Sequence, residues 1–183
     1  MITRTKNADQ EKPEEMLILG VGNPLMSDDG AGIRAVEWLA REDLPANVCI
    51  KEAGTPGWGL ASWLEGWNSV ILVDAVEMGE EPGTWRRFKP EDVKMIINEQ
   101  AYSLHETDLA CGLALADALH LLPENLVIYG IEPADTSPGE GLSPEVGAKL
   151  PGMVHKILEE ANTTHRFLRP TRTWSGSNPE GKY

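Results

Sequence analysis

Short apolar runs alternate with longer, helix-compatible stretches through most of this 183-residue chain. Four runs have the length and composition of strands buried inside a sheet: MLILGVG (16–22), NVCIKEA (47–53), SVILVDAV (69–76) and NLVIYGI (125–131). Helices are predicted between and after them, over 32–42, 59–67, 105–122 and 143–162. Strands that alternate with helices form a mostly parallel sheet with helices on both faces. The sequence therefore predicts an α/β fold.

The two ends of the chain depart from this pattern and divide it into three parts. Residues 1–15 are polar and predict a flexible lead-in, while residues 162–183 form a polar tail without periodicity. The segment between them, residues 16–161, is long enough to bury a hydrophobic core. We therefore expect one domain with a lead-in and a tail.

Proline and serine residues refine the predicted elements. A short extra strand is expected within EEPGTWRRF (80–88), followed by a helix over 90–99 that opens at Pro90. The last helix has Ser143 as its N-cap and a proline at its first position. Pro151 lies inside this helix, where we expect it to kink or divide the helix.

Charge and composition exclude several classes of function. The formal net charge of -13 argues against a nucleic-acid partner, because phosphate binding needs clustered Lys and Arg. No apolar run approaches the ~20 residues that cross a bilayer, and the N-terminus has no signal-peptide pattern. Two cysteines, Cys49 and Cys111, form neither a disulfide framework nor a CxxC metal site. We expect a cytoplasmic protein without a membrane partner.

Polar side chains that could carry chemistry follow the predicted strands. Asp29 follows the first strand, Asp74 ends the third, and His105 precedes the long helix. In open α/β sheets, ligands bind beyond the carboxyl ends of the strands, so these three residues converge on one rim. Two carboxylates and an imidazole are a plausible ligand set for a divalent metal with an open position. The neighbouring Asp28 is interpreted as a helix N-cap.

A nucleotide site is the competing interpretation of the segment LGVGNPLMSDDGAG (19–32). It contains part of a dinucleotide fingerprint, but Leu25 occupies the position of the third glycine. Two acidic residues at the start of a helix would also repel a pyrophosphate. The chain has neither HExxH nor Gly-x-Ser-x-Gly, so no ordinary peptidase motif is present.

Several motifs, in order along residues 16–160, resemble the hydrogenase maturation endopeptidases of the HyaD/HycI-like type. The likeness begins with LGVGNPLMSDDGAGIRAVEWL and includes Gly54 and Thr55. It continues through VILVDAV (70–76), PGTWRRF (82–88), SLHETDLACGLALADAL (103–119) and GIEPADTSPGEGLSPEV (130–146). This family trims the large subunit of nickel–iron hydrogenases. The resemblance implies a three-layer αβα domain with a twisted, mostly parallel sheet.

The resemblance also implies a site and a substrate. The family's metal-binding positions match Asp29, Asp74 and His105, and the first of these is Glu or Asp in the family. The metal would be nickel supplied by the substrate, the large-subunit precursor of a nickel–iron hydrogenase, with no organic cofactor. As a metal-dependent endopeptidase, the protein would remove a short C-terminal peptide, with Asp29 or Asp74 accepting a proton from water. Asn23, Gly54 and Thr55 would line the substrate cleft, together with the loop from Glu132 to Gly141.

Three other functions remain open from the sequence. A chaperone-like module could bind the nickel-containing subunit through the same residues without cutting it. The segment GVGNP also resembles the start of peptidyl-tRNA hydrolases, but the residues that follow it there are missing here and the acidic core does not suit tRNA. A plain nucleotide-binding domain is the third alternative.

Overall fold

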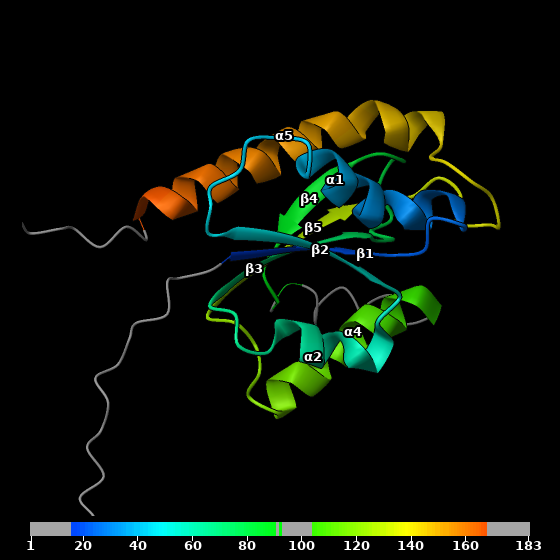
Figure 1. Cartoon of the computed structure of the whole chain (residues 1–183). Helices are drawn as coiled ribbons and strands as arrows, with labels where there is room; N and C mark the ends of the chain where they lie inside the picture. The colour runs from blue at the N-terminus through cyan, green and yellow to red at the C-terminus, as the bar shows by residue number, and fades with distance from the viewer. Residues whose placement is uncertain (1–15, 91, 93–103, 168–183) are drawn as a thin grey trace, which may run out of the picture.

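A five-stranded sheet runs through the middle of the protein, with helices on both of its faces (Figure 1). The computed structural model describes residues 16–90, 92 and 104–167. The strand order is β2-β1-β3-β5-β4, and every neighbouring pair is parallel except β4 with β5. The strands are β1 (Met16–Val21), β2 (Val48–Gly54), β3 (Ser69–Ala75), β4 (Trp85–Phe88) and β5 (Asn125–Ile131). The predicted three-layer αβα fold is confirmed.

The central strands consist of apolar residues because both of their faces are buried. All six residues of β1 are buried, and so are the first six of β3. Residues of β1 alternate between the two halves of the core: Ile18 packs on one side of the sheet and Leu19 on the other. The edge strand β2 is only partly buried, which agrees with its charged residues Lys51 and Glu52.

The helices form two layers, each packed on its own half of the core. Helices α1 (Ala31–Leu39) and α5 (Pro144–Phe167) cover one face, and α2 (Leu60–Leu64) and α4 (Leu104–Ala118) cover the other (Figure 1). Two 3-10 turns, η1 (Ser27–Gly30) and η2 (Gly57–Gly59), precede α1 and α2. No helix in the described part of the chain is long and apolar enough to cross a membrane.

The last helix confirms one prediction and corrects another. The backbone N–H of Val146 donates to the Ser143 hydroxyl at 3.2 Å, so Ser143 is the expected N-cap. Pro151 does not divide the helix, which continues from Pro144 to Phe167 and past residue 161. Buried Leu150 and Met153 lie on either side of Pro151 and hold this turn against the core. The helix predicted over 90–99 lies mostly outside the described residues.

The topology creates a crevice between β1 and β3. The chain leaves β1 toward α1 on one face of the sheet, and after β3 the next described helix, α4, lies on the other face. Adjacent strands whose connections diverge in this way leave a ligand-binding crevice beyond their carboxyl ends. The start of α1 closes tightly on this point, since a Cβ on Gly32 would lie 2.2 Å from the Val73 carbonyl oxygen.

Candidate functional site

Asp29 and Asp74 line the same small pocket at the carboxyl ends of β1 and β3. Asp29 belongs to η1, which follows β1, and Asp74 is the penultimate residue of β3. The pocket has a volume of about 40 Å³, and its other lining residues are Val21, Gly22, Thr55, Pro56, Gly57, Leu60, Ala75 and Leu109. Two predicted site residues that are 45 positions apart in the sequence are therefore brought together by the parallel pairing of their strands.

Gly22 allows the two carboxylates to approach each other. Its φ of 119° is in the left-handed region, which favours glycine. A Cβ at this position would lie 1.8 Å from the Asp29 carbonyl oxygen and 3.8 Å from Asp74 Oδ1. The turn after β1 can therefore fold back against β3 only with glycine at residue 22.

The environment of Asp74 disfavours its ionised form. The pKa of Asp74 is raised from 3.8 to about 8: burial contributes most, the negative charge of Asp29 adds to it, and the hydrogen bond from the Ala75 N–H partly opposes both effects. Asp29 and Asp74 are 7 % and 8 % exposed, and neither forms an ion pair with any side chain in the described part of the chain. The pocket thus holds two buried acidic groups without a described counter-ion.

The three residues predicted to line the substrate cleft have different positions. Thr55 lines the pocket. Asn23 is not among the lining residues, and its backbone N–H donates to Asp29 Oδ2 at 2.7 Å. The Gly54 carbonyl accepts a hydrogen bond from the Gly22 N–H at 2.8 Å, which ties the end of β2 to the turn after β1. Asn23 and Gly54 therefore hold the pocket in shape.

The third predicted ligand, His105, lies in the first turn of α4. Leu109, one helical turn later, lines the pocket. The side chain of His105 is outside the described part of the structure. Among the side chains that are described, no group of three His, Cys, Asp or Glu is arranged to hold a metal ion. The titratable side chains that the structure describes in the pocket are those of Asp29 and Asp74.

Asp28, which the sequence analysis interpreted as a helix N-cap, has another role. Neither η1 nor α1 has a side-chain cap, so that interpretation is wrong. The fully buried Asp28 carboxylate accepts three backbone N–H bonds, from Ala134 at 2.9 Å, Asp135 at 3.1 Å and Ser143 at 2.7 Å. It holds the loop between β5 and α5 against η1. The sequence shows two adjacent acids, but it does not reveal which loop supplies these amides.

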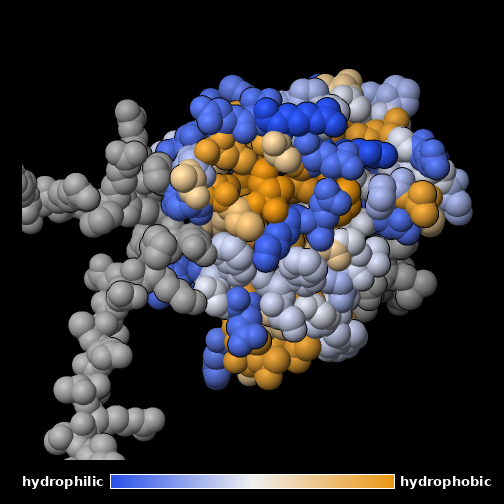
Figure 2. All heavy atoms as spheres, in the orientation of Figure 1, coloured by the Kyte–Doolittle hydropathy of each residue, from blue (hydrophilic) through white to orange (hydrophobic). Residues whose placement is uncertain are grey.

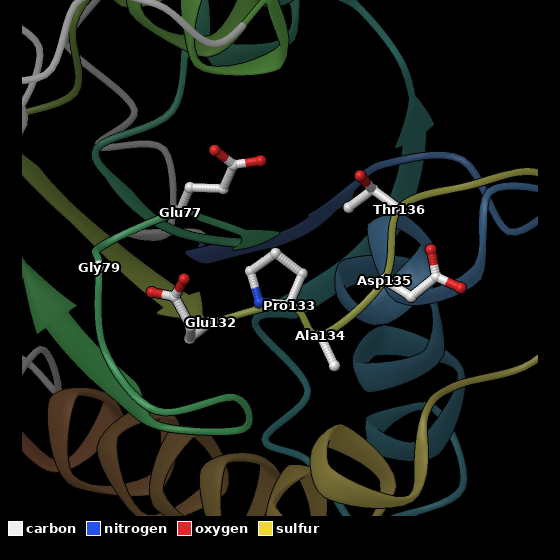
Figure 3. Close-up of a pocket in the computed structure, with 7 residues that line it drawn as sticks. All are labelled: Glu77, Gly79, Glu132, Pro133, Ala134, Asp135 and Thr136. Carbon is white, nitrogen blue, oxygen red and sulfur yellow. The ribbon is translucent and has the colours of Figure 1, made fainter.

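The loop that begins at Glu132 lines a second and larger cavity of about 240 Å³ (Figure 3). Its lining residues are Glu77, Gly79, Glu132, Pro133, Ala134, Asp135 and Thr136. The buried Glu132 carboxylate accepts the N–H groups of Met78 at 2.6 Å and Glu80 at 3.2 Å. Glu132 therefore organises the segment between β3 and β4. Residues 132–136 line this cavity and not the pocket that contains Asp29 and Asp74.

Comparison with known proteins decides the family. The family model for hydrogenase maturation proteases matches residues 33–160. This chain belongs to the hydrogenase maturation protease family. The hydrogenase expression/formation protein HupD of Rhodobacter capsulatus is 34% identical over 151 residues, which cover 81% of this chain and 72% of HupD.

Two solved structures extend the likeness to three dimensions. The hydrogenase maturating endopeptidase HybD from E. coli superimposes with a TM-score of 0.73 at 30% identity, covering 82% of this chain and 93% of HybD. The [NiFe] hydrogenase maturation protease HybD from Thermococcus kodakarensis superimposes with a TM-score of 0.66 at 30% identity. The match covers 80% of this chain and 99% of the Thermococcus protein. Membership of the hydrogenase maturation protease family makes this protein an endopeptidase, a hydrolase of peptide bonds.

Proposed function

We propose that this protein removes a short C-terminal peptide from the nickel-loaded large-subunit precursor of a nickel–iron hydrogenase in the cytoplasm. The family supplies the reaction class, hydrolysis of a peptide bond. The observation that supports this choice of substrate is the pocket that Asp29 and Asp74 line. Two buried carboxylates without a described counter-ion are costly, and a cation that arrives with the substrate offsets this cost.

The nickel of the substrate is the cation we assign to this pocket. We assign Asp29, in the turn after β1, and Asp74, near the end of β3, as its oxygen ligands. The nitrogen ligand implied by the family resemblance is His105, a residue of the first turn of α4. A set this small leaves positions open for ligands that the substrate retains and for a water molecule. Either carboxylate accepts a proton from that water as it attacks the peptide carbonyl. A precursor without nickel lacks the group that this pocket recognises.

The test compares the precursor of a nickel–iron hydrogenase large subunit with and without nickel. Each form is incubated with the protein, and intact mass spectrometry determines the C-terminus. We expect loss of a short peptide from the nickel-loaded form alone. Binding without a change in mass would indicate a chaperone-like function, and cleavage of both forms would contradict nickel recognition.

Two variants test the assigned residues. Asp29→Asn and His105→Ala should keep the circular dichroism spectrum of the wild type and abolish processing. The matched control is Glu124→Gln, which makes the same carboxylate-to-amide change at an exposed position next to the amino end of β5. Glu124→Gln should process the precursor at the wild-type rate. An active variant with both Asp29→Asn and His105→Ala would refute the assignment.

A further inference from the structure

The two edges of the sheet differ in length and in protection. Strand β4 has 4 residues, and its charged side chains form ion pairs: Arg87 with Glu160 at 2.8 Å, and Arg86 with Glu80. Strand β2 has 7 residues and is half-buried for most of its length. Short, charge-covered edges resist pairing with other chains, whereas a longer open edge can accept another strand. Within the part of the chain that the structure describes, the open edge of this sheet is β2.

The register of β1 and β2 identifies the backbone groups that are free at this edge. Ile50 and Glu52 lie directly opposite Ile18 and Gly20, and the Met16 N–H donates to the Asn47 carbonyl at 3.0 Å. In a parallel pair with this register, the N–H and C=O groups of Ile50 and Glu52 point away from β1. Among the described residues, none forms a backbone hydrogen bond with these outward groups.

The edge leads directly into the pocket. Gly54 is the last residue of β2, and Thr55, which follows it, lines the pocket with Asp29 and Asp74. In Figure 1, β2 lies in front of the other strands, so its free edge faces the viewer. An extended peptide paired with β2 would therefore have one end at the two carboxylates. At about 3.3 Å per residue, β2 offers a track of roughly 23 Å.

The side chains beside the edge differ between the two faces of the sheet. Figure 2 shows a hydrophobic patch on the face of the molecule that is turned toward the viewer. On the α1 side of the sheet, the half-buried apolar residues packed against the core include Trp38, Leu44, Val48 and Ile50. On the α2 side, the Lys51 ammonium lies 5.9 Å from the ring centroid of Trp63 and 5.4 Å from that of Trp67. A strand added here would have apolar surroundings on one face and a cation beside aromatic rings on the other.

We propose that the edge of β2 binds the C-terminal extension of the substrate as an added strand. The inference rests on the proposed function, because it takes the peptide that is removed as the occupant. The extension begins at the scissile bond in the pocket and runs away from it, so it is antiparallel to β2. Its side chains alternate: apolar residues face Val48 and Ile50, and acidic or polar residues face Lys51.

The first experiment removes one hydrogen-bond donor from the edge. Glu52→Pro deletes an outward N–H at an exposed position, where proline is tolerated because β1 does not use this group. We expect KM for the nickel-loaded precursor to rise about tenfold with little change in kcat. Glu52→Thr changes the same side chain but keeps the N–H. Any rise in KM that the two variants share belongs to the side chain and not to strand pairing. Thermal unfolding of both variants checks that the fold is retained.

The second experiment introduces proline at successive positions of the substrate extension. Strand pairing predicts that sensitivity alternates with a period of two residues, because every second N–H faces β2. Amide exchange measured by NMR on the complex with an extension peptide should slow at Ile50 and Glu52.

The outcomes separate this inference from the proposed function. If the unmodified precursor is not cleaved, the proposed function fails. If it is cleaved but proline has no period-two effect and Ile50 and Glu52 exchange as before, the function stands and strand addition is refuted.

Discussion

Two buried aspartates, Asp28 in η1 and Asp74 in β3, should respond in opposite ways to the same substitution. Asp74→Asn is expected to stabilise the metal-free protein, and Asp28→Asn is expected to destabilise it. Both are buried and both change from carboxylate to amide. The difference lies in their hydrogen bonds: Asp28 accepts three backbone N–H bonds, whereas Asp74 accepts one, from Ala75. An amide at residue 74 can still accept that bond through its oxygen.

The expected gain for Asp74→Asn follows from linkage. The pKa of Asp74 is raised from 3.8 to about 8 in the folded protein. Between these values the folded state keeps a proton that the unfolded state releases, so stability falls as pH rises through this window. At pH 7 the difference between the two pKa values of Asp74 lowers the free energy of unfolding by about 4 kcal/mol. We halve this cost to about 2 kcal/mol because the pocket opens to water. Asparagine does not titrate and removes this cost.

The expected loss for Asp28→Asn follows from its three amide partners. An asparagine oxygen replaces at most one of the two acceptor oxygens, and its NH2 group meets the N–H that the other oxygen accepted. At least one buried N–H therefore loses its partner. Hydrogen bonds to a charged group contribute about 1.5–3 kcal/mol each, so we expect a loss of about 3 kcal/mol. The loop from β5 to α5 should then loosen from η1.

Thermal unfolding with a chelator present measures both effects. For a chain of this length, 1 kcal/mol corresponds to roughly 2–4 °C, so Asp74→Asn should raise Tm by about 4–8 °C at pH 7. Asp28→Asn should lower Tm by about 6–12 °C. The gain for Asp74→Asn should shrink as pH falls toward 4. An Asp74→Asn variant with a wild-type Tm at pH 7, or with a gain independent of pH, would refute the linkage argument.

Three further outcomes test other parts of the molecule. Gly32→Ala places a Cβ 2.2 Å from the Val73 carbonyl oxygen and should lower the free energy of unfolding, measured in urea, by at least about 3 kcal/mol. The control is Gly147→Ala in α5, whose Cβ meets nothing within 4 Å and should raise this free energy by about 0.5–1 kcal/mol. Tyr129→Phe removes the hydroxyl that donates to Glu160 at 2.7 Å and should cost about 1–2 kcal/mol; an unchanged urea midpoint would contradict this. Stripping nickel from the precursor should stop its processing, and restoring nickel should recover it within the same mass-spectrometric assay.

Local sequence patterns were sufficient to predict most of the elements. The runs that became β1, β3 and β5 are apolar because strands in the middle of a parallel sheet are buried on both faces. The N-cap at Ser143 was also predictable, since capping depends on residues within one turn. Division of the last helix at Pro151 was not borne out, because Leu150 and Met153 on either side of it pack against other elements.

The candidate site could be predicted only in part. Parallel strands bring their carboxyl ends to one rim, so the topology implied that Asp29 and Asp74 approach each other, and they share one pocket. The sequence separated Asp29, a predicted metal ligand, from Asp28, but it gave Asp28 the wrong role of a helix N-cap. The Asp28 carboxylate accepts hydrogen bonds from backbone N–H groups within residues 134–143, more than a hundred positions away in the sequence. The roles of Asn23 and Gly54 in holding the pocket also depend on contacts across strands.

The sequence by itself determined the layers of the fold, the family and the residues that could carry chemistry, because these depend on local periodicity and motif order. Only the tertiary structure showed that Asp28 holds a loop and that Asp29 shares one pocket with Asp74. It also decided which edge of the sheet stays open and where the second cavity lies. These properties depend on burial and hydrogen bonding between segments far apart in the chain, and in a low-dielectric interior those contacts set the cost of each charge.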